Sequence, residues 1–321
     1  MVFAGFIGLR AAGTFPNIAN LPAFPSQAIA MPPDAPRPAP QPHPAAAPAK
    51  AQPAAARGVD SAVDLASGEP VAVRMYGRKK AGHASPLVVH FHGGAFVSGD
   101  LDNGHTVAHL LEGAGAVVVS VAYPLTPFPQ PVDTGYGVLQ WVHRHRTKLG
   151  GQGALVYLAG EEAGGNLAAA VALMARDQAH PPLAGQILLS PMLDPCVGSA
   201  SQRRTTGDAV DCKWVQGWRN FLRCPRDAEH PYAVPASAHR LSGVPPTLVL
   251  VGDTDPMRDE ALAYAARLHA AGLQVTQHVF AKAEKWPEPL LETGPHECPC
   301  AGAVQEEFRR FFEATRCRES S

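Results

Sequence analysis

The turn from Gly160 to Gly164 has the glycine spacing of a strand-to-helix turn that exposes a catalytic side chain. In the G-x-S-x-G pattern the central residue is a serine, whose hydroxyl attacks a carbonyl carbon. Here the central residue is Glu162. A carboxylate has no such hydroxyl, and its attack on an ester would form an anhydride, which is uphill. The turn therefore predicts a site in which ordinary serine-type ester hydrolysis is weak or lost.

A second motif contains Gly93 and Gly94 in the segment His92 to Phe96, directly after an apolar run. Glycines carry no Cβ, so their backbone N–H groups can face a cavity and stabilise a developing oxyanion. The N–H of Ala163, the residue after the central position, would complete this oxyanion hole. Two glycines after a strand are usually only a turn, so the prediction depends on both motifs occurring together.

An acid and a histidine follow in the order required of a catalytic triad. Asp255 comes just after the apolar run 246–252, where a carboxylate can orient a histidine. His296 lies between the last expected strand and the last expected helix. The order of central residue, aspartate and histidine is one of the known triad orders. Three aspartates compete in the segment 253–259, and helix capping accounts for at least one of them.

The periodicity of apolar residues predicts the elements that must position these side chains. Strands are expected at 70–76, 87–92, 116–122, 155–159, 183–189, 246–252 and 275–280, and helices at 103–113, 132–148, 167–174, 259–271 and 303–314. This alternation predicts a mostly parallel central sheet with helices on both faces. The segment 197–240 loses the alternation and predicts a small inserted cap with an amphipathic helix around Trp214.

The first 57 residues form a proline- and alanine-rich stretch that predicts an extended tail, so we expect one domain over residues 58–316. Folding of residues 6–24 over the mouth of the site, as part of a lid, is the alternative. The segment 1–12 has its arginine after the apolar run and makes a poor signal peptide, which favours a cytoplasmic location. No stretch is long enough to predict a transmembrane helix.

The composition of the chain limits the classes of partner and cofactor that it is expected to bind. A formal net charge of −1 argues against a nucleic-acid partner or a membrane surface held by bulk electrostatics. Cys298 and Cys300 lie beside His296, but their spacing fits no standard zinc pattern. We therefore predict no metal, no cofactor and reduced thiols in a loop. Glu161, next to the central residue, is interpreted as structural.

Taken together, these stretches resemble the hormone-sensitive-lipase-like branch of the α/β-hydrolase fold, the bacterial carboxylesterase group. The matching segments are HFHGGAFVSGD, LAGEEAGGNLAAAVALMARDQ, PPLAGQILLSPMLDP, HPYAVP and PPTLVLVGDTDPMRDEALAYAARLHAAG, over roughly residues 70–280. The resemblance implies an α/β-hydrolase fold with a cap, and a small-molecule ester or other apolar ligand. It also implies Asp255 and His296 as triad members and Gly93 and Gly94 as oxyanion-hole residues. A homodimer is also considered.

The sequence departs from this family at the nucleophile, where the family's G-D-S-A-G-G reads Gly160 to Gly165 with Glu162 at the serine position. Three roles for Glu162 remain open. It could occupy the oxyanion hole and pair with His296, giving a ligand-binding pseudo-hydrolase comparable in principle to plant hormone receptors on this scaffold. It could attack an sp³ carbon, or act as a general base on water. The chain is thus either a weak or altered hydrolase or an inactive ligand-binding protein.

Overall fold

The computed structural model describes residues 58–66, 68–80, 82–195, 199–206, 212–281 and 299–319. The predicted tail, His296 and Cys298 lie outside these residues. Whether the domain begins and ends where the sequence predicts therefore stays a prediction.

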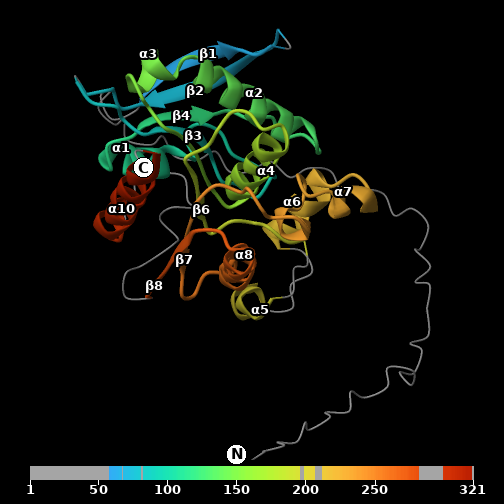
Figure 1. The fold of residues 1–321 in the computed structure, drawn as a ribbon. Coiled ribbons are helices and arrows are strands. Elements are labelled where there is room, and N and C mark those ends of the chain that lie inside the picture. The colour runs from blue at the N-terminus through green and yellow to red at the C-terminus, as the bar shows by residue number, and fades with distance from the viewer. Residues whose placement is uncertain are drawn as a thin grey trace, which may run out of the picture. The chain divides into compact units, whose positions relative to one another are not determined.

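An eight-stranded sheet organises the molecule, with the strand order β1-β2-β4-β3-β5-β6-β7-β8 (Figure 1). The strands are β1 (Val59–Asp64), β2 (Pro70–Tyr76), β3 (Leu87–Phe91), β4 (Val117–Val121), β5 (Val156–Glu161), β6 (Gly185–Leu189), β7 (Thr247–Gly252) and β8 (Val275–Phe280). The β1–β2 and β2–β4 pairs are antiparallel, and every pair from β4 to β8 is parallel. The predicted mostly parallel sheet is confirmed.

β1 has no counterpart among the predicted strands. Five of its six residues are exposed, so it carries almost no apolar pattern. It is held instead by its antiparallel ladder with β2. Apolar periodicity cannot predict such a strand, because the strand is held by pairing with its neighbour and not by buried apolar residues of its own.

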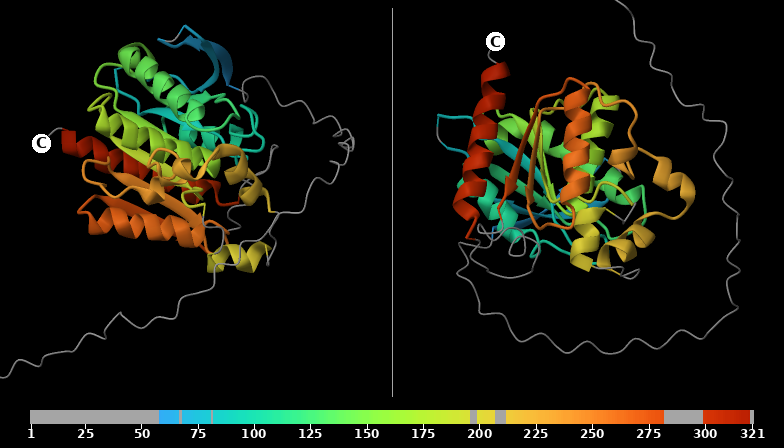
Figure 2. Two further views of the ribbon diagram at one scale, coloured as in Figure 1. Left: turned by 90° about the vertical axis from the view of Figure 1, so that its right-hand side faces the viewer. Right: turned by 90° about the horizontal axis from the view of Figure 1, so that it is seen from below.

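Helices cover both faces of the sheet (Figure 2). They are α1 (His105–Gly113), α2 (Gln130–Arg144), α3 (Arg146–Gly150), α4 (Ala163–Asp177), α8 (Arg258–Ala270) and α10 (Ala301–Glu319). Successive residues of β3 face opposite sides, so Val89 packs in the core under α2 and α4, and Val88 in the core under α1 and α10. Both central faces are apolar, as a sheet covered on both sides requires.

The single helix predicted at 132–148 is two helices, because the chain breaks at His145. The Nδ1–H of His145 donates to the carbonyl of Trp141 at 2.8 Å.

Between β6 and β7 lie the inserted helices α5 (Ala200–Thr206), α6 (Lys213–Phe221), α7 (Pro225–Glu229) and η2 (Pro235–Ser237). No helix within the described ranges is long and apolar enough to cross a bilayer.

The turn between β5 and α4 is tightly packed. Glu162 has φ +52° and ψ −117°, a backbone conformation that L-residues rarely adopt. A Cβ on Gly164 would lie 2.0 Å from the carbonyl oxygen of Phe91, and one on Gly160 would lie 2.1 Å from the carbonyl oxygen of Gly164. The glycines therefore let the turn press against β3, and the packing holds Glu162 in its strained conformation.

Gly164→Ala should destabilise the protein by about 3 kcal/mol, because the added Cβ collides with backbone atoms that cannot move aside. The measurement is the urea midpoint and its slope. Gly302→Ala in α10 is the matched control. Nothing lies within 4 Å of a Cβ there, and the change should be neutral or slightly stabilising. Equal midpoints for both variants would contradict this account of the turn.

Candidate active site

The predicted site residues that the structure describes lie at one edge of the sheet. Gly93 and Gly94 follow β3, Glu162 follows β5 and Asp255 follows β7. These strands are parallel, so their carboxyl ends share an edge, which is where ligands bind in open α/β sheets. His296 lies outside the described residues, and its pairing with Asp255 or Glu162 stays a prediction.

The carboxylate of Glu162 is fully buried and meets three donors. Its Oε2 accepts the backbone N–H of Gly94 at 2.9 Å. Its Oε1 accepts the indole N–H of Trp214 at 2.9 Å and lies 2.8 Å from Nζ of Lys213. The negative charge is therefore compensated without a contribution from histidine among these contacts.

The two glycines of the predicted oxyanion hole have different partners. The N–H of Gly94 points to Glu162, whereas the N–H of Gly93 donates to Oε1 of Glu161 at 3.1 Å. Oε2 of Glu161 is 2.7 Å from Nε2 of His90, and the other ring nitrogen of His90 is 3.0 Å from Oγ of Ser120. This buried network holds the glycine loop from behind and supports the structural interpretation of Glu161.

His92 anchors the same loop but brings no charge to it. Its ring stacks on Tyr123 with centroids 4.3 Å apart, and the Tyr123 hydroxyl donates to the His92 carbonyl. Its Nδ1–H donates to the carbonyl of Gly93 at 2.8 Å. Burial lowers the pKa of His92 to about 4, so the ring is neutral near pH 7.

Helix α6 of the inserted segment packs directly against the glycine loop. A Cβ on Gly217 would lie 1.7 Å from the carbonyl oxygen of Ala95. The rings of Phe96 and Phe221 stack with centroids 4.1 Å apart and an interplanar angle of 3°. Ala95 and Phe96, the loop residues that contact this helix, both have φ above +50°.

Lys213 and Trp214 are the site residues that sequence reasoning missed. They belong to α6, some fifty positions after the turn they contact, and no local spacing connects the two segments. The signal available was the aromatic helix expected in the inserted segment. Its contact with the turn depends on how that helix folds back over the sheet edge.

Asp255 is fully buried and held on both oxygens. The N–H of Met257 donates to Oδ1 at 2.8 Å, and the hydroxyl of Ser190 donates to Oδ2. Ser190 directly follows β6, so the neighbouring strand positions the carboxylate.

The prediction of reduced thiols in the segment after β8 is wrong for Cys300, because Cys300 is disulfide-bonded. Within the described ranges no group of three histidine, cysteine or acidic side chains could hold a metal ion.

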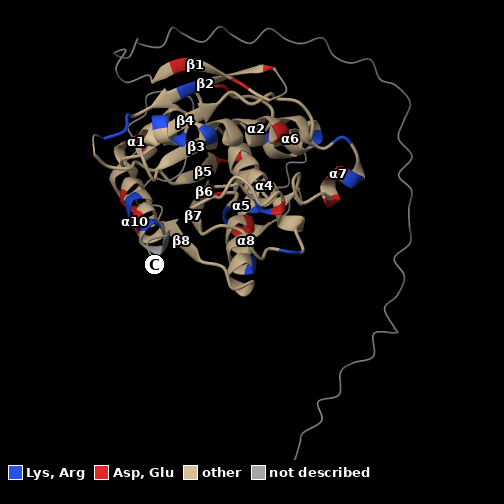
Figure 3. Cartoon of the chain, turned by 45° about the horizontal axis from the view of Figure 1, so that its top comes forward, with Lys and Arg blue, Asp and Glu red and all other residues tan. Residues whose placement is uncertain are grey.

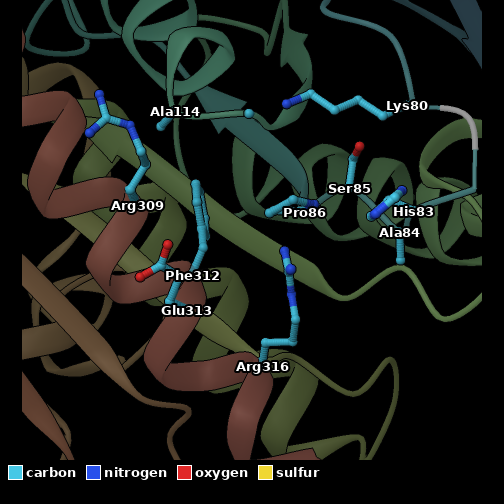
Figure 4. Close-up of a pocket in the computed structure, with 11 residues that line it drawn as sticks. Lys80, His83, Ala84, Ser85, Pro86, Ala114, Arg309, Phe312, Glu313 and Arg316 are labelled. Carbon is cyan, nitrogen blue, oxygen red and sulfur yellow. The ribbon is translucent and has the colours of Figure 1, made fainter.

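A hollow of about 220 Å³ lies at the opposite edge of the sheet, beside the turns that precede β3 and β4. It is lined by basic side chains, by the acidic Glu313 of α10 and by small or apolar residues, and the basic ones are Lys80, His83, Arg309 and Arg316 (Figure 4). It contains none of the predicted site residues. Acidic and basic residues are interspersed along α10 (Figure 3).

Glu260 is a buried carboxyl beside the site. Its Oε2 accepts the N–H groups of Leu193 and Asp194 at 3.3 and 2.9 Å, and its Oε1 has no hydrogen-bond partner among the residues that the structure describes. Burial, with a smaller contribution from the charges of Asp194 and Asp255, raises its pKa from 4.5 to about 8, although the two backbone hydrogen bonds act to lower it. The folded protein therefore holds a proton that the unfolded chain loses above pH 4.5.

The stability contributed by protonated Glu260 should be fully present below about pH 4.5 and lost as the pH rises to about 8. At 1.36 kcal/mol per pKa unit, the loss between pH 5 and pH 8 is up to about 4 kcal/mol. Glu260→Gln should remove this part of the pH dependence. The measurement is the difference in unfolding free energy between the two proteins at each pH, and parallel curves would contradict it.

Comparison with known proteins agrees with this fold. The family described as alpha/beta hydrolase fold matches residues 88–284, and the chain belongs to it. Esterase LipI of Mycobacterium tuberculosis is 34% identical over 233 residues, which are 69% of this chain and 72% of that protein. The gibberellin receptor GID1C of Arabidopsis thaliana is 35% identical over 211 residues, 60% of each chain.

Solved structures show the same relationship. Esterase LipW from Mycobacterium marinum is 33% identical, with a TM-score of 0.69 over 81% of this chain and 83% of that one. A thermostable esterase from Pseudomonas putida ECU1011 is 28% identical, with a TM-score of 0.70 over 82% and 84%. The α/β-hydrolase fold and the kinship with carboxylesterases are thus established for this chain.

Proposed function

We propose that Glu162 stands where the related esterases carry their nucleophilic serine, and that this chain is a ligand-binding member of the family with little or no serine-type ester hydrolysis. The observation that carries the proposal is the hydrogen bond from the N–H of Gly94 to Oε2 of Glu162. A carboxylate oxygen there takes the place that a substrate oxyanion would need. The position of Glu162 in a strained turn between β5 and α4 supports the assignment.

Hydrolysis by the serine mechanism loses two requirements at once in this arrangement. There is no hydroxyl at position 162 to be deprotonated and to attack the carbonyl carbon. The Gly94 donor is also occupied, so it cannot stabilise charge on a substrate oxygen unless Glu162 moves. Asp255 and the predicted His296 and Ala163 then remain as parts of a triad and an oxyanion hole without a nucleophile.

The contacts of Glu162 also weigh against it as a nucleophile or a base. Oε1 accepts from Trp214 and pairs with Lys213, and Oε2 accepts from Gly94. The side chain is fully buried, so an sp³ carbon or a water could approach it only by displacing one of these donors. Attack or proton abstraction needs a free lone pair aimed at the reacting atom, so these roles rank behind ligand binding.

Kinship with a receptor makes binding without turnover a reasonable use of this scaffold. A relative is named for gibberellin reception, and other relatives are named as esterases. The ligand of this chain is therefore proposed to be a small molecule held under the inserted helices. Weak ester hydrolysis is the second candidate, because Asp255 and Gly94 are both in place at the sheet edge.

Glu162→Ser should raise kcat/KM for short p-nitrophenyl esters by about 10²- to 10³-fold over the wild type, because it restores the hydroxyl and frees the Gly94 donor. Glu162→Ala is the matched control, since it frees the donor without supplying a nucleophile, and it should stay near the wild type. The proposal fails if the wild type already hydrolyses these esters and Glu162→Gln abolishes that activity.

A further inference from the structure

We propose that the ligand of the Glu162 site carries an ammonium group, and that Lys213 now occupies the position of that group. This inference rests on the proposed ligand-binding function and names the chemistry of the ligand. The cradle of an esterase stabilises a negatively charged oxygen, but with a carboxylate already held there the group that the site can pair with is a cation.

Lys213 marks the position that a bound ammonium would take. Its Nζ is 2.8 Å from Oε1 of Glu162 and 5.0 Å from the ring centroid of Trp214. A carboxylate on one side and an aromatic face on the other are the two elements that hold ammonium ions in proteins. Trp214 serves both parts, because its indole N–H also fixes the carboxylate at 2.9 Å.

The two partners of this ion pair differ in how firmly they are held. Glu162 is fully buried and accepts hydrogen bonds from Gly94 and Trp214. It lies in a backbone turn that packing holds fixed. The side chain of Lys213 is 47% exposed and ends a flexible four-carbon stem. The carboxylate therefore has to stay and needs a counter-charge, whereas the cation can be exchanged.

The charges around Glu162 favour a cationic ligand over an anionic or a neutral one. Glu161 adds a second carboxylate behind the glycine loop, paired with His90. His92 is neutral near pH 7 and supplies no positive charge. An anion would be repelled by Glu162, and a neutral carbonyl would find the Gly94 and Trp214 donors already in use.

The test is binding of n-butylammonium chloride, measured by isothermal titration calorimetry at constant ionic strength. Lys213→Met keeps the aliphatic stem and removes the tethered cation, so it should bind at least about tenfold more tightly than the wild type, in which Lys213 competes. The double variant Lys213→Met/Glu162→Gln should not bind. Lys148→Met, a change of an exposed lysine in α3, is the matched control and should behave as the wild type.

Equal binding by Lys213→Met and the double variant would overturn the inference, as would no binding by Lys213→Met beyond that of sodium chloride. Tighter binding of sodium butyrate than of n-butylammonium would also overturn it. If Lys213→Met does not fold, the same titration compares the wild type with Glu162→Gln, and loss of saturable n-butylammonium binding in the variant is expected. No ester is present, so this result is independent of the esterase assay on Glu162→Ser.

Discussion

Compensation of one buried negative charge organises the site. A carboxylate with no exposed surface is costly unless donors and a cation surround it. Glu162, in the turn after β5, finds these partners on two other parts of the chain, the loop after β3 and helix α6. The inserted segment is thereby tied to the sheet edge by charge as well as by apolar packing. Removing the carboxylate removes its contacts with both parts together.

The sheet supplies the frame on which this compensation depends. Parallel strands bring the loops after β3, β5 and β7 to one edge although they are far apart in the sequence. The networks behind them, His90 with Glu161 and Ser190 with Asp255, fix the loops from the interior of the sheet. Rigid support of this kind is retained whether the site turns over a substrate or only binds one.

The sequence was sufficient for the parts of the molecule that local patterns encode. The apolar runs of β3 to β7 and the glycines of the tight turn predict the sheet and place Glu162, Gly94 and Asp255 at its edge. β1 was missed because it is stabilised by its partner strand, and the break at His145 was missed because the apolar pattern carries no signal for it. Lys213 and Trp214 could not be predicted, because their contact with Glu162 arises only from tertiary packing.

The close approach of Gly217 to Ala95 also constrains how the inserted helices beside the site can evolve. The helix backbone there rests on the loop carbonyl with no room for even a methyl group. A shift or tilt of α6 therefore also moves the loop that presents Gly94, so the position of this helix cannot change without altering the hydrogen bond to Glu162. Variants of this scaffold that bind larger ligands would have to change helix α6 and the loop after β3 together.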